Sequence, residues 1–191
     1  HIRSRRQRQM CIRDRGMEGS GVISEIGKNV KSLKNGDEVM FGSWGHGAIA
    51  KEIVLPSSMV SLKPAKYTFA EAAAFKTVYL TAYVGLIRRG NLKDGETLLV
   101  HGASGGVGMA AVELGKLYGA KVIATGTSDE KLKVVKSWGA DHVINTIKNE
   151  KTSFREEVKD LTDGKGADII YDPVGGDVFD ESIRCINWGG R

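Results

Sequence analysis

Cysteine is scarce in this sequence, and long apolar runs are absent from it. Only Cys11 and Cys185 occur among the 191 residues. Two cysteines can build neither a disulfide framework nor a four-cysteine zinc lobe, so a reducing compartment, the cytoplasm, is expected. Because no run of eighteen apolar residues occurs, the sequence predicts no membrane-spanning helix. The 41% of hydrophobic residues is nevertheless enough for a buried core, so we expect a globular protein.

A charge excess of one sign is also missing once the first fifteen residues are set aside. Of the 28 basic and 23 acidic residues, six arginines and one aspartate lie within residues 1–15, which leaves 22 of each sign in the rest of the chain. A balanced chain carries no basic stripe, so nucleic acid is not an expected partner. The six arginines are Arg3, Arg5, Arg6, Arg8, Arg13 and Arg15.

Residues 1–15 do not have the pattern of a targeting signal. They contain neither the apolar centre of a secretory signal nor the periodicity of a transit helix. Met10–Arg15 resembles a translated sequencing adaptor. We therefore interpret residues 1–15 as a non-native or disordered segment, with a natural basic arm as the alternative.

From Gly16 onward, short alternating apolar runs are separated by Gly, Asn and Asp. Strands are predicted over 21–27, 37–41 and 48–55, with a turn at Asn35-Gly36. Helical periodicity runs from Phe69 to Arg89, and a change of composition at 63–68 marks the expected domain boundary. The prediction is a partial antiparallel β domain over 16–66 and a second domain over 67–191.

The second domain alternates strand and helix at regular spacing. Strands are predicted over 97–101, 121–125, 142–145 and 167–172, and helices over 105–118, 128–138, 152–162 and 177–186. Right-handed crossovers place such strands side by side and parallel, so the predicted fold class is α/β, with a doubly wound sheet of the Rossmann type. Cys185 falls on the apolar face of the last predicted helix, as a small buried hydrophobe. The chain stops where a fifth strand is expected, so we interpret it as a fragment whose fourth strand has an unpaired edge.

The segment Thr97–Gly108 joins an apolar strand to a helix through a glycine-rich loop. Gly102 permits the turn out of the strand, and Gly105 and Gly106 let backbone N–H groups approach a phosphate. Gly108 permits close packing of the helix on the strand. The helix then directs the positive end of its dipole at the anion, so the sequence predicts a dinucleotide pyrophosphate site.

The end of the next strand indicates which dinucleotide binds. An NAD site places an acidic side chain there, but here the strand over 121–125 is followed by Gly126, Thr127 and Ser128. The acidic residues that follow fit a capping box over Thr127–Glu130, which explains them as a helix start. Thr127, Ser128 and Lys131 remain near the ribose as hydroxyl donors and a cation, which favours NADPH over NADH.

Several motifs follow one another in a familiar order. They are Gly16–Gly21, Lys34–Asp37, Gly47–Glu52, Thr81-Ala82, Gly102–Gly108 and Asp172–Gly176. Together they resemble the medium-chain dehydrogenase/reductase superfamily, and within it the NADPH:quinone oxidoreductases of the zeta-crystallin type. The resemblance covers essentially everything after residue 15, and it implies a GroES-like catalytic domain, here partial, before the Rossmann domain.

The resemblance also implies roles for individual residues. Thr81 would lie near the nicotinamide, Lys131 would meet the 2′-phosphate, and Asn145 and Val174 would border the adenosine and the ribose. One departure is Thr146, where the family often has a tyrosine. The residues implied for the pyrophosphate are Gly102, Ser104, Gly105, Gly106, Val107 and Gly108.

The same resemblance indicates that no zinc is used. The zinc alcohol dehydrogenases of the superfamily carry Gly-His-Glu where this chain has Gly16-Met17-Glu18, and a thioether is a poor zinc ligand. Hydride transfer then needs an acceptor that is activated by conjugation, such as a quinone or an α,β-unsaturated carbonyl. The histidines have no nucleophile at a meaningful spacing, so no general acid is assigned.

Two other functions remain open from the sequence. One is an enoyl-thioester reductase of the same fold, since the acceptor pocket and not the glycine loop separates it from a quinone reductase. The other is a non-catalytic nucleotide-binding protein of a crystallin-like or RNA-associated kind. The family resemblance further implies a homodimer for the whole protein.

Overall fold

The computed structural model describes residues 16–43, 47–147 and 154–191. The predictions made for residues 1–15 and for His46 fall outside these ranges. Internal contacts divide the chain into two units, one up to Thr77 and the other from Val78 to Arg191. The division lies inside the helix that follows the composition change at 63–68. None of the helices formed by the described residues is long and apolar enough to cross a membrane.

The first unit contains an antiparallel sheet of three short strands in the order β1-β2-β3. The strands are β1 (Glu18–Val22), β2 (Glu38–Gly42) and β3 (Val60–Leu62), and the 3₁₀ helix η1 (Ser57–Met59) precedes the last. Gly19 lies opposite Phe41, and a Cβ on Gly19 would stand only 2.7 Å from the Phe41 ring. The missing side chain on β1 therefore provides the space in which the buried Phe41 ring packs.

Two strand predictions in this unit need correction. The first strand spans 18–22 and not 21–27, and residues 48–55 form no strand. Both edges of β2 are already paired, with β1 and with β3, so the alternating pattern over 48–55 has no free edge beside β2. Ile49 and Val54 are accordingly exposed. The turn at Asn35-Gly36 is confirmed, with Gly36 at a φ of +87°.

Helix α2 (Phe69–Tyr83) begins with a reciprocal capping arrangement. Thr68 N–H donates to Glu71 Oε2 at 2.8 Å, and Glu71 N–H donates to Thr68 Oγ1 at 3.2 Å. The helix continues as the π-helix η2 (Val84–Arg89), where a Cβ on Gly85 would stand 2.7 Å from the Tyr171 ring. The predicted helical stretch from Phe69 to Arg89 is therefore confirmed, with a wider last turn beside Tyr171.

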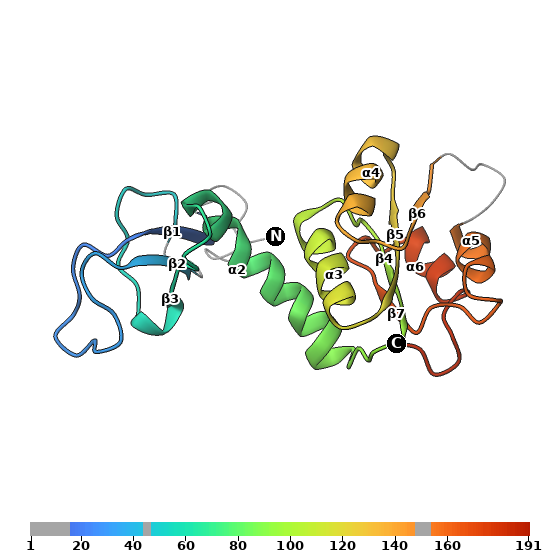
Figure 1. Cartoon of the computed structure of the whole chain (residues 1–191), viewed down its shortest axis with the longest axis horizontal. Helices are drawn as coiled ribbons and strands as arrows, with labels where there is room; N and C mark the ends of the chain where they lie inside the picture. Colours follow the sequence, from blue (N-terminus) through green and yellow to red (C-terminus); the bar gives the residue numbers. More distant parts are fainter. Residues whose placement is uncertain (1–15, 44–46, 148–153) are drawn as a thin grey trace, which may run out of the picture. The chain divides into compact units, whose positions relative to one another are not determined.

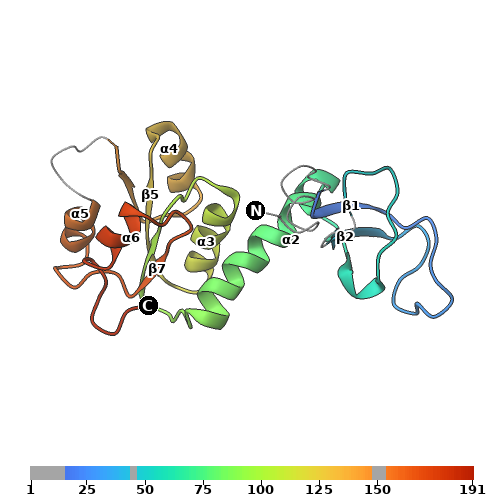
Figure 2. The same cartoon turned by 180° about the vertical axis from the view of Figure 1, so that it is seen from behind.

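The second unit is built on a parallel sheet of four strands in the order β6-β5-β4-β7. The strands are β4 (Thr97–Val100), β5 (Lys121–Gly126), β6 (His142–Asn145) and β7 (Ile169–Tyr171). The helices are α3 (Gly106–Leu117), α4 (Asp129–Ser137), α5 (Phe154–Asp160) and α6 (Asp177–Ser182). Figures 1 and 2 show α3 and α4 on one face of the sheet, with α5 and α6 on the other. The predicted doubly wound sheet is confirmed.

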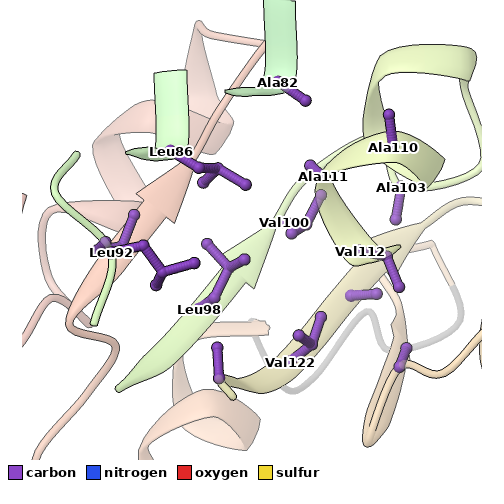
Figure 3. Packing of buried hydrophobic residues seen from close by; sticks show 14 of the residues in the cluster. Ala82, Leu86, Leu92, Leu98, Val100, Ala103, Ala110, Ala111, Val112 and Val122 are labelled. Carbon is purple, nitrogen blue, oxygen red and sulfur yellow. The ribbon is translucent and has the colours of Figure 1, made fainter. Parts of the chain in front are cut away.

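Alternate residues of the central strands feed two separate cores. Leu98 and Val100 of β4 pack on the α3 face, and Figure 3 shows them with Ala111 and Val112 of α3. Leu99 packs on the opposite face, with Val158 of α5 and with Cys185. This alternation is the reason that each strand reads as a continuous apolar run in the sequence.

The end of the chain differs from the prediction in two respects. Helix α6 ends at Ser182 and not at residue 186, because the Cys185 carbonyl accepts a bond from Ala167 N–H at 2.9 Å and leads the chain along β7. Cys185 is fully buried, as predicted, although outside a helix. The outer edge of β7 is also partly paired: Ile170 N–H donates to Arg191 O, and Arg191 N–H donates to Asp168 O.

Candidate functional site

The glycine loop leaves the carboxyl end of β4 in a tightly bonded turn. His101 N–H donates to the Tyr171 carbonyl and Ala103 N–H to the Thr125 carbonyl, each at 3.0 Å, so the loop is bonded to both neighbouring strands. Gly102 has a φ of +58°, a value that suits glycine. Gly105 N–H donates to the Gly102 carbonyl, which closes the turn before α3.

Gly108 is the point of closest approach between α3 and the loop. A Cβ at this position would stand 2.5 Å from the Gly102 carbonyl oxygen and 2.7 Å from Ala103 Cα. Both neighbours are backbone atoms, which cannot rotate away as a side chain could. The predicted role of Gly108 in close packing of the helix on the strand therefore agrees with the backbone geometry.

The first turn of α3 presents free backbone donors. The amides of the first helical turn have no carbonyl partner within the helix. Among the residues that the structure describes, no side chain forms a capping bond at the N-cap residue Gly105. Ser104, Gly105 and Gly106 are exposed, and Val107 is partly exposed. Without a Cβ at Gly105 and Gly106, an anion can approach these amides, so the loop has the donors and the space that a pyrophosphate needs.

Two predicted cofactor residues from other elements belong to the same unit as the loop. Val174 Cγ2 would lie 3.4 Å from a Cβ on Gly102, so it borders the turn out of β4. Val78 of α2 stands 3.1 Å from the Cβ position of Gly106, and Thr81 follows three residues later, exposed at the surface of the same helix.

The start of α4 corrects the predicted capping box. The N-cap is Ser128 and not Thr127, and its side chain accepts from Lys131 N–H at 3.4 Å. A box would need Glu or Gln at the third helical position, but Lys131 occupies it. Thr127 and Lys131 are exposed and Ser128 is partly buried. Among the described residues no ion pair is seen for the Lys131 ammonium, which leaves it available to an anionic ligand.

Asn145 ends β6 and bonds to the first residue of α4. Its Nδ2 donates to Asp129 Oδ1 at 2.6 Å, and its Oδ1 accepts from Ile147 N–H at 3.1 Å. A groove between α4 and β6 is lined by both partners of the first bond together with Leu132, Lys133, Lys136 and Val143. Asn145 thus stands at the carboxyl end of the strand beside β5 and contacts the α4 start directly.

His101 is buried beneath the loop and bonded on both ring nitrogens. Ser182 Oγ donates to a main-chain carbonyl of α6 at 2.6 Å, so it accepts from His101 Nε2–H at 2.9 Å. Thr125 Oγ1 then donates to Nδ1 at 2.8 Å. Burial lowers the pKa of His101 to about 4, so the ring is neutral at physiological pH. The bonds on both ring nitrogens indicate a structural role for His101.

The sequence analysis assigned no individual role to Asp172, although it lies in the Asp172–Gly176 motif, and none to the pair Tyr79 and Glu113. Asp172 Oδ1 accepts from Val174 N–H at 2.8 Å and Gly175 N–H at 3.0 Å, while its Oδ2 is buried without a hydrogen-bond partner among the described residues. An aspartate before Val-Gly-Gly is a signal for such a turn. Tyr79 of α2 donates to Glu113 of α3, and burial raises the pKa of Glu113. No local pattern links that pair.

No group of three or more His, Cys, Asp or Glu side chains in the described ranges is arranged to hold a metal ion. Met17, at the position discussed for zinc, is 54% exposed. Glu18 beside it accepts from Thr77 N–H of α2 at 2.8 Å. This carboxylate therefore fixes the helix to the small sheet.

Comparison with known proteins identifies relatives along most of the chain. A family model described as a zinc-binding dehydrogenase matches residues 106–191. A quinone oxidoreductase-like protein 2 homolog of Nematostella vectensis is 42% identical over 176 residues, which are 92% of this chain and 47% of the relative. The quinone oxidoreductase of Homo sapiens is 34% identical over 92% of this chain and 53% of its own. The chain thus spans about half the length of these two relatives.

Other relatives are enoyl reductases or larger synthases. The highly-reducing polyketide synthase 1 of Aureobasidium melanogenum is 37% identical over 92% of this chain and 8% of the relative. The solved CurK enoyl reductase has a TM-score of 0.80 at 31% identity, over 92% of this chain and 51% of its own. Escherichia coli quinone oxidoreductase, solved with NADPH, has a TM-score of 0.79 at 33% identity, over 90% of this chain and 52% of its own.

Proposed function

The chain belongs to the medium-chain dehydrogenase/reductase superfamily, and from this premise we propose that it binds NADPH as part of a zinc-independent oxidoreductase. The whole protein transfers a hydride from NADPH to a quinone or a related α,β-unsaturated carbonyl. In this proposal residues 16–66 are part of a GroES-like catalytic domain, and residues 67–191 are the nucleotide-binding domain.

The observation that carries the proposal is the closeness of Gly108 to the Gly102 carbonyl. This close approach holds the start of α3 against the end of β4. The exposed glycines of the loop and the uncapped amides of the first turn of α3 lie at the same place. We assign the pyrophosphate to Gly102, Ser104, Gly105, Gly106, Val107 and Gly108. The dipole of α3 and its free N–H groups would stabilise the negative charge there.

The cofactor's phosphorylated ribose is assigned to the end of β5 and the start of α4. Lys131 supplies a cation on the first turn of α4, Thr127 an exposed hydroxyl and Ser128 the N-cap. Asp129, the first acidic residue after β5, accepts a hydrogen bond from Asn145 of β6. This arrangement suits a 2′-phosphate better than a free diol.

The chemistry proposed for the whole protein is a hydride transfer that the bound nicotinamide supplies. The chain's own residues bind and orient the dinucleotide, with Thr81 near its nicotinamide end and Val174 beside the turn at Gly102. Met17 replaces an imidazole ligand, which supports chemistry without zinc. An acceptor activated by conjugation fits this lack of a Lewis acid.

Binding is tested by titrating this chain with NADPH and with NADH, following nicotinamide fluorescence. Lys131→Met is expected to weaken NADPH binding about tenfold, through loss of one charge-assisted contact to phosphate, and to leave NADH binding unchanged. Lys133→Met is the matched control, two residues further along α4, and should leave both affinities unchanged. Equal losses for both dinucleotides, or no loss, would contradict the ribose assignment.

Turnover is tested on the full-length protein with NADPH and two acceptor classes, a benzoquinone and an enoyl thioester. Reduction of the quinone supports the proposal. The similarity to CurK and to polyketide synthases favours an enoyl-thioester reductase as the second candidate, and reduction of the thioester alone would establish it. NADPH binding without reduction of either acceptor would instead favour a non-catalytic, crystallin-like role.

We propose a cytoplasmic location and a homodimeric whole protein as well. The location rests on the scarcity of cysteine, and the dimer rests on the family to which the chain belongs. Sedimentation of the full-length protein tests the dimer, and a monomer at micromolar concentration would exclude a stable one.

A further inference from the structure

The carboxylate of Asp129 is held on the β6 side of β5. Asn145 Nδ2 donates to its Oδ1 at 2.6 Å, and both side chains line the groove between α4 and β6. The sheet order β6-β5-β4 places the glycine loop on the other side of β5. Helix α4 packs against both β5 and β6. The first negative charge after β5 is therefore directed away from the strand that carries the glycine loop.

Asn145 is fixed in the orientation that this contact needs. Its Oδ1 accepts from Ile147 N–H at 3.1 Å, so its NH₂ group must face Asp129. A flipped amide would place Asn145 Oδ1 against the Asp129 carboxylate and Asn145 NH₂ against Ile147 N–H, so both hydrogen bonds would be lost. Asn145 is also partly buried, at the carboxyl end of β6. The amide therefore restrains the direction of the Asp129 carboxylate as well as contacting it.

The direction of this carboxylate matters for the choice of dinucleotide. A carboxylate beside the ribose accepts from the free 2′- and 3′-hydroxyls, whereas it repels a 2′-phosphate. This repulsion is stronger at a protein surface than in bulk water, because the effective dielectric constant is lower there. A repulsion of about 1.4 kcal/mol lowers an affinity about tenfold.

We propose that Asn145 is a specificity-determining positioning residue, which holds Asp129 away from the ribose and thereby favours the 2′-phosphorylated dinucleotide. This inference rests on the proposed NADPH-binding function. Asn145 would then be a second determinant of specificity beside Lys131. The Lys131 ammonium attracts the 2′-phosphate, and the Asn145 amide keeps the Asp129 carboxylate from repelling it.

The test compares four forms of the 191-residue chain: the wild type, Asn145→Leu, Asp129→Asn and the double variant. Leu is branched at Cγ as Asn is but cannot donate a hydrogen bond, so it removes the Asn145 contact with the carboxylate. The ratio of the NADH and NADPH dissociation constants is expected to fall about tenfold in Asn145→Leu. Adding Asp129→Asn removes the charge and should restore the ratio. Asp129→Asn alone should keep at least the wild-type ratio.

The outcomes separate the inference from the function on which it rests. An unchanged ratio in Asn145→Leu, or an equal fall in the double variant, overturns the role of Asn145 while NADPH binding stands. If the wild type binds neither dinucleotide, the proposed function itself is wrong. If Asn145→Leu does not fold, Asn145→Ser replaces it in the test, because the serine hydroxyl is too short to reach Asp129. The ratio of the NADH and NADPH dissociation constants should fall about tenfold in this variant as well.

Discussion

Replacing Gly108 by alanine tests the packing of α3 on the glycine loop. The added Cβ would stand 2.5 Å from the Gly102 oxygen, 2.7 Å from Ala103 Cα and 2.9 Å from the Ala103 carbonyl carbon. These are backbone atoms of a turn that is itself bonded to β5 and β7, so the strain must be relieved by displacing α3. Displacement opens the packing between α3 and the core residues of β4.

The expected cost follows from two opposing effects. Forcing one extra methyl into a packed interior costs about 1–3 kcal/mol. Alanine recovers at most about 1 kcal/mol of that through its better helix propensity. The upper part of the range is appropriate here because no side chain can yield, so a net loss of about 2 kcal/mol is expected. For a chain of this size the melting temperature should fall by roughly 4 to 8 °C.

The assay is thermal unfolding followed by circular dichroism, with Gly105→Ala as the matched control. At Gly105 a Cβ would stand 3.4 Å from its nearest atom, an ordinary contact, and the residue's φ is −80°. The control should therefore lose at most about 1 kcal/mol, from the poorer N-cap. A Gly108→Ala protein that melts with or above the wild type would refute the reasoning.

Three further perturbations test the second unit. Burial lowers the pKa of His101 from 6.5 unfolded to about 4 folded, so its contribution to stability is fully present above pH 6.5 and is lost as pH falls toward 4. We expect the wild type to lose about 3 kcal/mol of its unfolding free energy over that window. Urea unfolding at pH 7 and pH 4.5 should show a smaller difference in unfolding free energy between the two pH values for His101→Gln than for the wild type. Burial raises the pKa of the Cys185 thiol to about 11, so iodoacetamide at pH 8 should label it far more slowly in the native protein than in urea, as measured by peptide mass spectrometry. Ser128→Ala removes the N-cap of α4 and should cost about 0.5–1 kcal/mol by urea unfolding, while Ser128→Gly should cost only a few tenths; equal losses would contradict the capping bond.

The Rossmann half could be predicted closely because its signals are local. The central strands β4 and β5 are almost wholly buried. Helix α3 has its own stop, Gly119 at a φ of +77°. The glycine loop could be predicted for the same reason, since strand, loop and helix are contiguous. Periodicity therefore carried enough information to place all four strands of the parallel sheet.

The small sheet could not be placed as well, because its pairing depends on distant partners. Residues 48–55 alternate as a strand should, yet β2 pairs instead with β3, a segment of only three residues. The same limit applies at the site. The bond from Asn145 to Asp129 joins residues 16 positions apart, and the contact of Tyr79 with Glu113 joins residues 34 positions apart. Such contacts follow from the assembled fold and leave no periodic trace.

The buried imidazole of His101 also has a consequence for cooperativity. Its partners, Thr125 and Ser182, come from β5 and α6, at 24 and 81 residues' distance along the chain. An intermediate that lacks α6 loses the bond to Ser182, and such a bond contributes about 0.5–1.5 kcal/mol net. Intermediates that contain β4 and β5 but lack α6 are thereby disfavoured. Early and late segments of the second unit should gain and lose hydrogen-exchange protection together.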